Sequence, residues 1–236
     1  MKKVLAVLAL AAGLVPRPAL AQSSIVSQIA GDKAASEKFY FSLKLGLNVS
    51  YLTGAEAGTE RSGGFNVGLS AFIRLSGRWS LAPEITPFSR KGLSGIPFTA
   101  TGDPALDAAF ADPAASSLDL RYTDVPVLVK YRRGRFHLGA GPVVSFLSGA
   151  SERFRADLDD GEDLRYKRDV SDRFRKTDVG LACEASWTIT RPRGGTGLVL
   201  HVRYMAGLIN VLRAGEPGGP LRNSVIQAYL SFPFIR

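Results

Sequence analysis

The sequence contains an unbroken alternation of apolar and polar side chains from Phe39 to Tyr51. Every odd-numbered residue of this stretch is apolar or aromatic, whereas the even-numbered positions carry Lys44 and several glycine, serine and asparagine residues. Because successive side chains of a strand point to opposite faces, the stretch predicts a β-strand with one apolar and one polar face. Its 13 residues exceed an average globular strand and suit a tilted membrane crossing, which needs about 9–11 residues.

Seven further segments alternate in the same way, so the chain is expected to form eight strands. The expected strands cover residues 38–52, 64–75, 79–88, 118–131, 136–148, 177–189, 198–210 and a last segment that presents Ile226, Ala228, Leu230, Phe232 and Phe234 on its apolar face. Pro83, Pro87, Pro126 and Pro142 fall inside these strands. Each proline removes one hydrogen bond from the ladder, so we expect bulges or shifted boundaries there.

The connections between the predicted strands alternate between long and short. Short turns are expected at 76–78, 132–135 and 191–197, and the longest connections at 89–117 and 149–176. Bacterial outer-membrane barrels have even strand numbers, short periplasmic turns and longer extracellular loops. Trp79, Tyr131, Phe136 and Trp187 lie next to the short turns, which is typical of an aromatic girdle at the inner interface. The predicted fold class is all-β, an eight-stranded antiparallel up-and-down transmembrane β-barrel.

The N-terminus resembles a secretory signal. Lys2 and Lys3 precede a short apolar run, and Ala19-Leu20-Ala21 gives the small-x-small pattern of a cleavage site. We expect residues 1–21 to be removed as a signal peptide, residues 22–37 to form a flexible periplasmic lead-in, and residues 38–236 to form the barrel domain. The expected location is the outer membrane of a Gram-negative bacterium.

The chain is basic, with a formal net charge of +9 that falls to +6 when the three basic residues of the signal are lost. Its basic residues lie in turns and loops beside acidic ones rather than along one stripe, which argues against nucleic acid as a partner. We expect contacts with outer-membrane lipid and lipopolysaccharide at the barrel rims, an unidentified partner for the extracellular loops, and a monomeric state.

Alternation by itself does not say which face of a strand points inward. A soluble exported barrel of the lipocalin type would turn its apolar faces inward and bind a ligand there. Strand length, aromatic residues at the rims and the asymmetry of the loops favour the membrane barrel, in which the apolar faces meet lipid.

In the membrane barrel, the polar faces bring ionisable residues into the interior. The predicted interior ionic cluster consists of Lys44, Glu84, Asp124, Lys130, Glu184 and Arg203. Counting residues from the short turns places five of them near mid-height and Lys130 closer to the periplasm. An eight-stranded barrel is just filled by side chains, so one interpretation is a plug of paired charges that stiffens the barrel. The other is a narrow polar pore, which would make the protein a small porin-like channel for ions or small solutes.

No pattern in the sequence favours catalysis, a cofactor or a tightly held metal. His137 and His201 point inward without a serine or carboxylate beside them in an evident motif, so we expect packing histidines and no enzyme. The segment from Asp157 to Asp163 superficially resembles a calcium loop, but its spacing is one residue short and basic residues around it balance the acidic ones. Cys183 lies within a predicted strand, as a small packing residue does.

Several segments resemble the PorT-like family of outer-membrane β-barrel proteins. The run from Tyr122 to Tyr131, YTDVPVLVKY, resembles that family's Y-x-E-I-P-L-L-L-K strand, with Asp124 in place of the usual glutamate, and Gly139 to Val144 is similar to the following G-x-G-P-Y-x strand. Asp178-Val179-Gly180 and the segment from Arg203 to Asn210 are similar to later motifs in the same order. The resemblance implies the barrel fold; most members have no assigned activity. We therefore expect a structural or interaction protein that displays long extracellular loops.

Overall fold

The computed structural model describes residues 38–54, 60–95, 104, 116–157, 163–193, 196–216 and 219–234. Nine strands span these ranges: β1 (Phe39–Thr53), β2 (Glu60–Arg74), β3 (Trp79–Ser94), β4 (Ser116–Arg133), β5 (Phe136–Asp157), β6 (Asp163–Asp169), β7 (Thr177–Arg193), β8 (Thr196–Gly207) and β9 (Arg222–Phe234). A short 3-10 turn, η2 (Ser171–Arg173), follows β6. The predicted signal peptide and lead-in lie outside the described residues.

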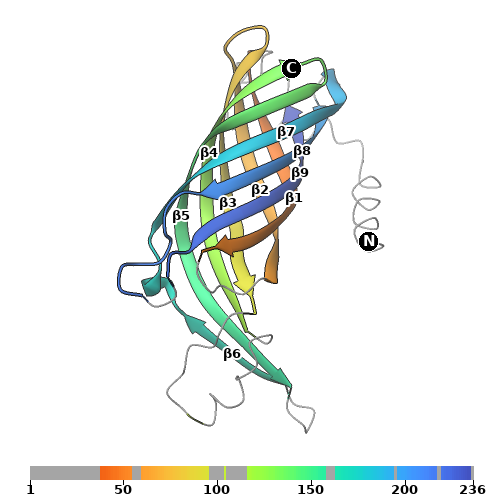
Figure 1. Ribbon diagram of the computed structural model, residues 1–236. Coiled ribbons are helices and arrows are strands. Elements are labelled where there is room, and N and C mark those ends of the chain that lie inside the picture. Colours follow the sequence, from red (N-terminus) through yellow and green to blue (C-terminus); the bar gives the residue numbers. More distant parts are fainter. Residues whose placement is uncertain are drawn as a thin grey trace.

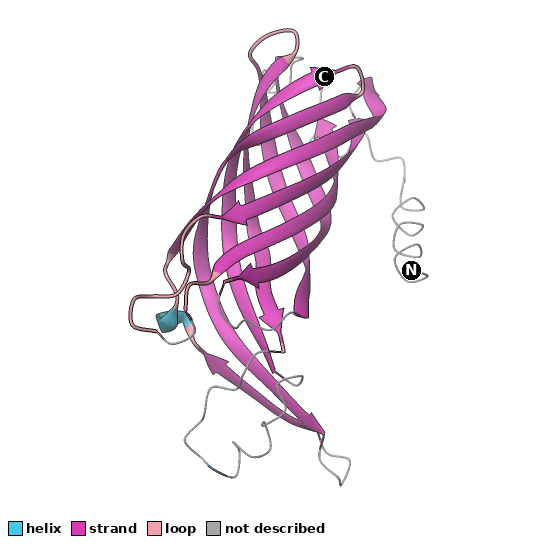
Figure 2. Ribbon diagram, in the orientation of Figure 1, coloured by secondary structure: helices cyan, strands magenta, loops and turns pink. Residues whose placement is uncertain are grey.

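Eight of the strands close into a barrel. Each strand pairs antiparallel with its neighbours in the order β1-β2-β3-β4-β5-β7-β8-β9, and β9 pairs with β1 to complete the ring. Strongly tilted strands surround one narrow interior, with the short connections at one end (Figures 1 and 2). The predicted fold class is thereby confirmed. Among the described residues, no helix is long and apolar enough to cross a membrane.

The apolar faces of the strands point outward. On β1, the side chains of Leu45, Leu47 and Val49 are exposed, while Lys44 and Asn48, at even-numbered positions, are buried in the interior. The same division holds around the ring, with Phe65, Leu138, Leu181 and Val202 among the exposed apolar residues. Such an exterior is suited to lipid, and it is the reverse of the apolar interior that the lipocalin-like alternative requires.

Two long connections are more ordered than the sequence predicts. The segment 149–176 is not a loop throughout, because β5 continues to Asp157 and pairs with β6, and η2 follows. Likewise β3 continues beyond Phe88 to Ser94 and pairs there with the first residues of β4. β5 and β6 form a hairpin that extends beyond the other strands, at the end opposite the short turns (Figure 1).

Irregularities in the ladder explain why these extensions are difficult to predict. Between Thr86 and Ser89 the register of β3 against β4 shifts, so Pro87 lies at a bulge as expected. A second shift separates Arg121 from Tyr122 on β4 where it pairs with β5. A bulge inserts an extra residue and so changes which face the following residues occupy. Pro83, Pro126 and Pro142, in contrast, keep regular cross-strand partners.

Candidate functional site

Five of the six predicted interior charges meet in one buried network at the middle of the barrel. The carboxylate oxygens of Glu84 lie 2.5 Å from Lys44 Nζ, 2.6 Å from Arg203 Nη2 and 3.5 Å from Lys130 Nζ. Glu184 binds the same Arg203 nitrogen and receives Lys130 Nζ at 2.6 Å. Every side chain of the network is at most 4% exposed. These residues form the mid-barrel network, in which three cations face two carboxylates.

Tyr229, His201 and Ser231 complete the network, and the sequence pattern did not single out their roles. The Tyr229 hydroxyl accepts a hydrogen bond from Arg203 Nη2 at 2.6 Å and donates one to Glu184. Lys44 Nζ lies 4.1 Å from the centre of the Tyr229 ring, a distance typical of a cation–π contact. The His201 ring stacks on the Tyr229 ring with 4.5 Å between the ring centroids.

His201 also joins a serine to a carboxylate. Its Nδ1 lies 2.9 Å from Glu184 Oε1, and its Nε2 lies 2.7 Å from Ser231 Oγ. No sequence motif marks this arrangement, because strand pairing brings together residues that are far apart in sequence. The order serine, histidine, carboxylate is that of hydrolase triads.

The surroundings of this Ser–His–Glu arrangement do not favour catalysis. Ser231 and His201 are each only 3% exposed, and a nucleophile needs space for a substrate carbonyl beside it. The carboxylate of Glu184 is also occupied by Lys130 and Arg203. Among the described residues, no group of three or more histidine, cysteine or carboxylate side chains is arranged to hold a metal ion. Cys183 is exposed on the outer face rather than packed in a core.

Glycines opposite the charged residues make room for this network. Gly139 pairs with Lys130 on one side and with Glu184 on the other. A Cβ at Gly139 would lie 3.0 Å from Lys130 Cγ, and one at Gly46 would overlap Tyr229 Cβ. The small residues of the inner faces therefore leave space for long side chains from the neighbouring strands, as close packing of a narrow barrel requires.

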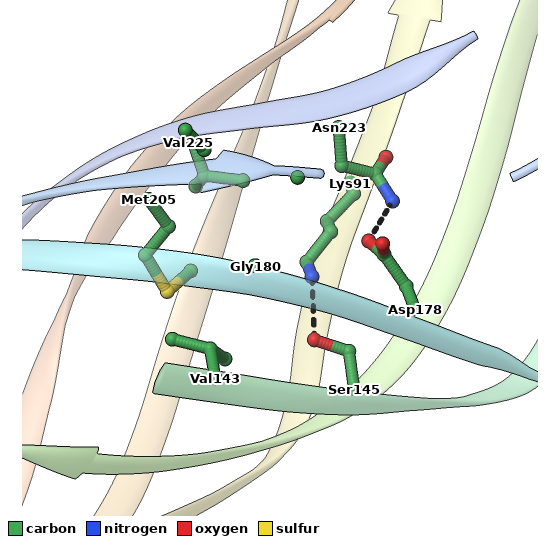
Figure 3. A pocket seen from close by; sticks show the side chains of 10 residues that line it. Lys91, Val143, Ser145, Asp178, Gly180, Met205, Asn223 and Val225 are labelled. Carbon is green, nitrogen blue, oxygen red and sulfur yellow. Dashed lines mark hydrogen bonds between the residues drawn. The ribbon is translucent and has the colours of Figure 1, made fainter. Parts of the chain in front are cut away.

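Asp124 lies outside the mid-barrel network. Its Oδ1 is 2.8 Å from Lys91 Nζ, which also donates a hydrogen bond to Ser145 Oγ at 3.0 Å. Figure 3 shows this region, where Asn223 Nδ2 donates to Asp178 Oδ2 at 2.7 Å beside a cavity with room for about one water molecule. We call Lys91, Asp124, Ser145, Asp178 and Asn223 the upper polar cluster. Its two carboxylates, Asp124 and Asp178, face one lysine, Lys91. The two groups together hold four cations and four carboxylates, so their charges balance.

An apolar cluster lies at the end of the barrel opposite the short turns, which is the extracellular end in outer-membrane barrels. It contains Leu52, Leu93, Leu118, Leu120, Tyr122, Ala150, Val170, Phe174, Val211 and Leu212, all buried. These residues come from the ends of β1, β3 and β4, from β5, and from the segments around η2 and after β8. Phe174 and Leu212 form a backbone bridge between the last two segments. We call this group the mouth cluster.

Ion pairs hold the segment around η2 over the mouth cluster. Arg173 contacts Glu152 of β5 at 3.2 Å and Glu216 of the segment after β8 at 2.8 Å. The backbone N–H of Ala150 donates to Ser171 Oγ at 2.9 Å. The described part of the extracellular end is therefore tied to the barrel by side-chain contacts as well as by apolar packing.

A family model described as an outer membrane protein beta-barrel domain matches residues 21–213. The chain belongs to this family. Members of the outer membrane protein beta-barrel domain family are located in the Gram-negative outer membrane, and this location accounts for the apolar exterior of the barrel. A comparison with curated proteins finds no match.

Solved outer-membrane barrels resemble the chain at low sequence identity. Neisserial surface protein A is 15% identical, and the match covers 83% of this chain and 96% of that one with a TM-score of 0.41. OprG of Pseudomonas aeruginosa is 10% identical, with 86% and 99% of the chains covered and a TM-score of 0.43. Ail of Yersinia pestis is 9% identical, with 84% and 99% covered and a TM-score of 0.39.

Proposed function

We propose that the protein is a closed outer-membrane barrel that does not conduct, and that its role lies in the structures it presents outside the cell. The observation that carries this proposal is the filling of the interior at successive levels: the mid-barrel network, the upper polar cluster and the mouth cluster. Within the described residues, the remaining space near the upper polar cluster is about that of one water molecule.

The energetics of the interior argue against a path for ions. Arg203 lies within hydrogen-bond distance of both Glu84 and Glu184. An ion passing through the middle of the barrel would have to separate the arginine from these two carboxylates. Breaking a buried pair is costly because it leaves a charge without its partner. At the extracellular end the ion would then meet Leu93, Leu120 and other side chains that are at most a few per cent exposed, and apolar constrictions oppose wetting.

The hairpin of β5 and β6 is the structure best suited to display. Seven residue pairs join the two strands, from Ser151 with Asp169 to Asp157 with Asp163. A paired hairpin anchored to a barrel strand presents a fixed surface, which lowers the ordering cost of binding a partner. This is consistent with the structural or interaction role expected from the PorT-like resemblance.

Conductance in planar bilayers tests the proposal. Wild-type protein, shown to be folded by a mobility shift between boiled and unboiled samples, is expected to give no discrete current steps. Lys44→Ala, which alters the interior, and Leu47→Ala, which alters only the lipid face, serve as a matched pair. Steady steps in the wild type that change with Lys44→Ala and not with Leu47→Ala would establish the alternative, a small channel lined by the predicted interior charges.

A further inference from the structure

We propose that the outer face of β3, β4, β5 and β6 holds a binding site for a phosphorylated outer-leaflet lipid, whose acyl chains lie on the adjoining apolar surface. The site is formed by Arg90, Arg121, Arg153 and Lys167, which we call the cationic strip. It lies on the outside of the barrel and does not depend on whether the lumen conducts.

Strand register places these four cations together on one face. Arg90 of β3 is directly opposite Arg121 of β4, and Arg153 of β5 is directly opposite Lys167 of β6. Directly paired residues of an antiparallel sheet share a face, and like charges in such pairs repel. Two adjacent like-charge pairs are unfavourable for the isolated protein and favourable for a protein that binds an anion between them.

Among the described side chains of this face, two carboxylates lie beside the cationic strip. Asp119 accepts hydrogen bonds from Arg90 Nε at 3.1 Å and Arg90 Nη2 at 2.9 Å, and another from Arg153 Nη2 at 2.8 Å. Asp169 stands opposite Ser151 on the same face. Hydrogen bonds from Ser171 lower the pKa of Asp169, and the positive charges of Arg121 and Lys167 lower it further. Within the described side chains, the four cations of the strip therefore share Asp119 and Asp169.

The arginines are held in place yet remain open to solvent. The side chains of Arg90 and Arg153 are 44% and 45% exposed although both contact Asp119. Arg121 lies across Gly149 on the neighbouring strand, where an added Cβ would come within 2.6 Å of the guanidinium nitrogen. Arginines fixed by neighbours lose little entropy on binding, and the planar guanidinium matches two phosphate oxygens at once.

The height of the strip matches the level of lipid headgroups. Ten residues of β4 separate Tyr131, near the short turn, from Arg121. At ~3.3 Å per residue and a tilt of about 40°, they rise roughly 25 Å, which is the height of the apolar band of such barrels. The cationic strip therefore begins where the outer leaflet gives way to its charged headgroups, the level at which basic residues attract anionic lipids.

Exposed aromatic residues next to the strip, on its membrane side, indicate a ligand with acyl chains. Phe88, at the bulge of β3, is 75% exposed, and Phe146 of β5 is 48% exposed. Phe88 is two residues from Arg90 along β3, and Phe146 pairs with Thr123, which is two residues from Arg121 along β4. A soluble anion would use the cations alone. A phosphorylated lipid contacts both surfaces, because its chains cover the aromatic residues while its phosphates reach the guanidinium groups.

Lipid retention measured by native mass spectrometry tests the assignment. Full-length protein is folded in detergent, mixed with bis-phosphorylated lipid A, and compared with Arg90→Gln/Arg121→Gln. We expect the double variant to bind about 25-fold more weakly, since each arginine near an anionic lipid contributes about a factor of five. Arg133→Gln, the same charge change at the periplasmic end of β4, is the matched control and should bind like the wild type.

Further ligands separate the sources of phosphate. Lipid A lacking its phosphates should bind weakly to all variants, and inorganic phosphate should compete only at high concentration. The proposal is overturned if the dephosphorylated lipid binds as tightly, if inorganic phosphate or a soluble sulfated oligosaccharide binds as tightly as lipid A, or if Arg133→Gln loses as much affinity. Should the double variant fail to fold, Lys167→Gln on β6 outside the barrel provides the same test, and unchanged retention would refute the site.

Discussion

Glu184→Gln is expected to destabilise the barrel more than Arg203→Met, although each removes one charge from the same buried network. The mid-barrel network holds Lys44, Lys130 and Arg203 against Glu84 and Glu184. Without the arginine, two lysines still face two carboxylates. Without Glu184, three cations crowd around Glu84 alone, and a buried excess of positive charge remains.

The expected magnitudes follow from these contacts. Glu184 lies within hydrogen-bond distance of Lys130 and Arg203; a pair of unit charges ~4 Å apart at an effective dielectric constant of about 20 interacts by about 4 kcal/mol. Desolvation offsets several kcal/mol of this sum, so removal of the carboxylate should cost about 3–5 kcal/mol. Arg203→Met loses hydrogen bonds but leaves two lysines facing two carboxylates, and we expect a cost of about 1–3 kcal/mol.

Reversible urea unfolding from phospholipid vesicles is the assay, followed through the fluorescence of Trp79 and Trp187, which both lie on the outer face. The double variant Glu184→Gln/Arg203→Met closes a mutant cycle, and it should cost about 1–3 kcal/mol less than the sum of the single variants. Equal costs for the two single changes, or strict additivity in the cycle, would refute the charge balance derived for this network.

Three further predictions concern the outer face, the packing and the Ser–His–Glu arrangement. Leu181→Arg should cost about 2–4 kcal/mol in bilayers because the side chain faces lipid. Leu75→Arg, next to the short turn, should change stability little, and equal effects of the two changes would contradict the assigned faces. Gly46→Ala should cost about 1–3 kcal/mol by urea unfolding because its Cβ would overlap β9, and Gly63→Ala, which meets open space, is the control. A fluorophosphonate probe should leave Ser231 of the folded barrel unmodified, and labelling detected by mass spectrometry would show that the interior opens to substrates.

The position of the interior charges was only partly predictable from the sequence. Alternation along β1 and β7 correctly turns Lys44 and Glu184 inward, because a strand's own periodicity fixes the face of each residue. Heights were less predictable. Lys130 joins the mid-barrel network although it was expected lower, and Asp124, expected at mid-height, pairs with Lys91 instead. Tilted strands and long side chains make a residue count along one strand a poor measure of height relative to another.

The sequence by itself determined the barrel, its lipid-facing surface and the polar character of its interior, since all three depend on a period of two and on the lengths of the connections. Only the tertiary structure decided which side chains meet. The contact of Ser231 with His201, the opposition of Arg153 and Lys167, and the extension of β5 beyond the membrane all depend on the register between strands. Register is set by bulges and cross-strand packing, and outside the bilayer no apolar face remains to mark a strand in the sequence.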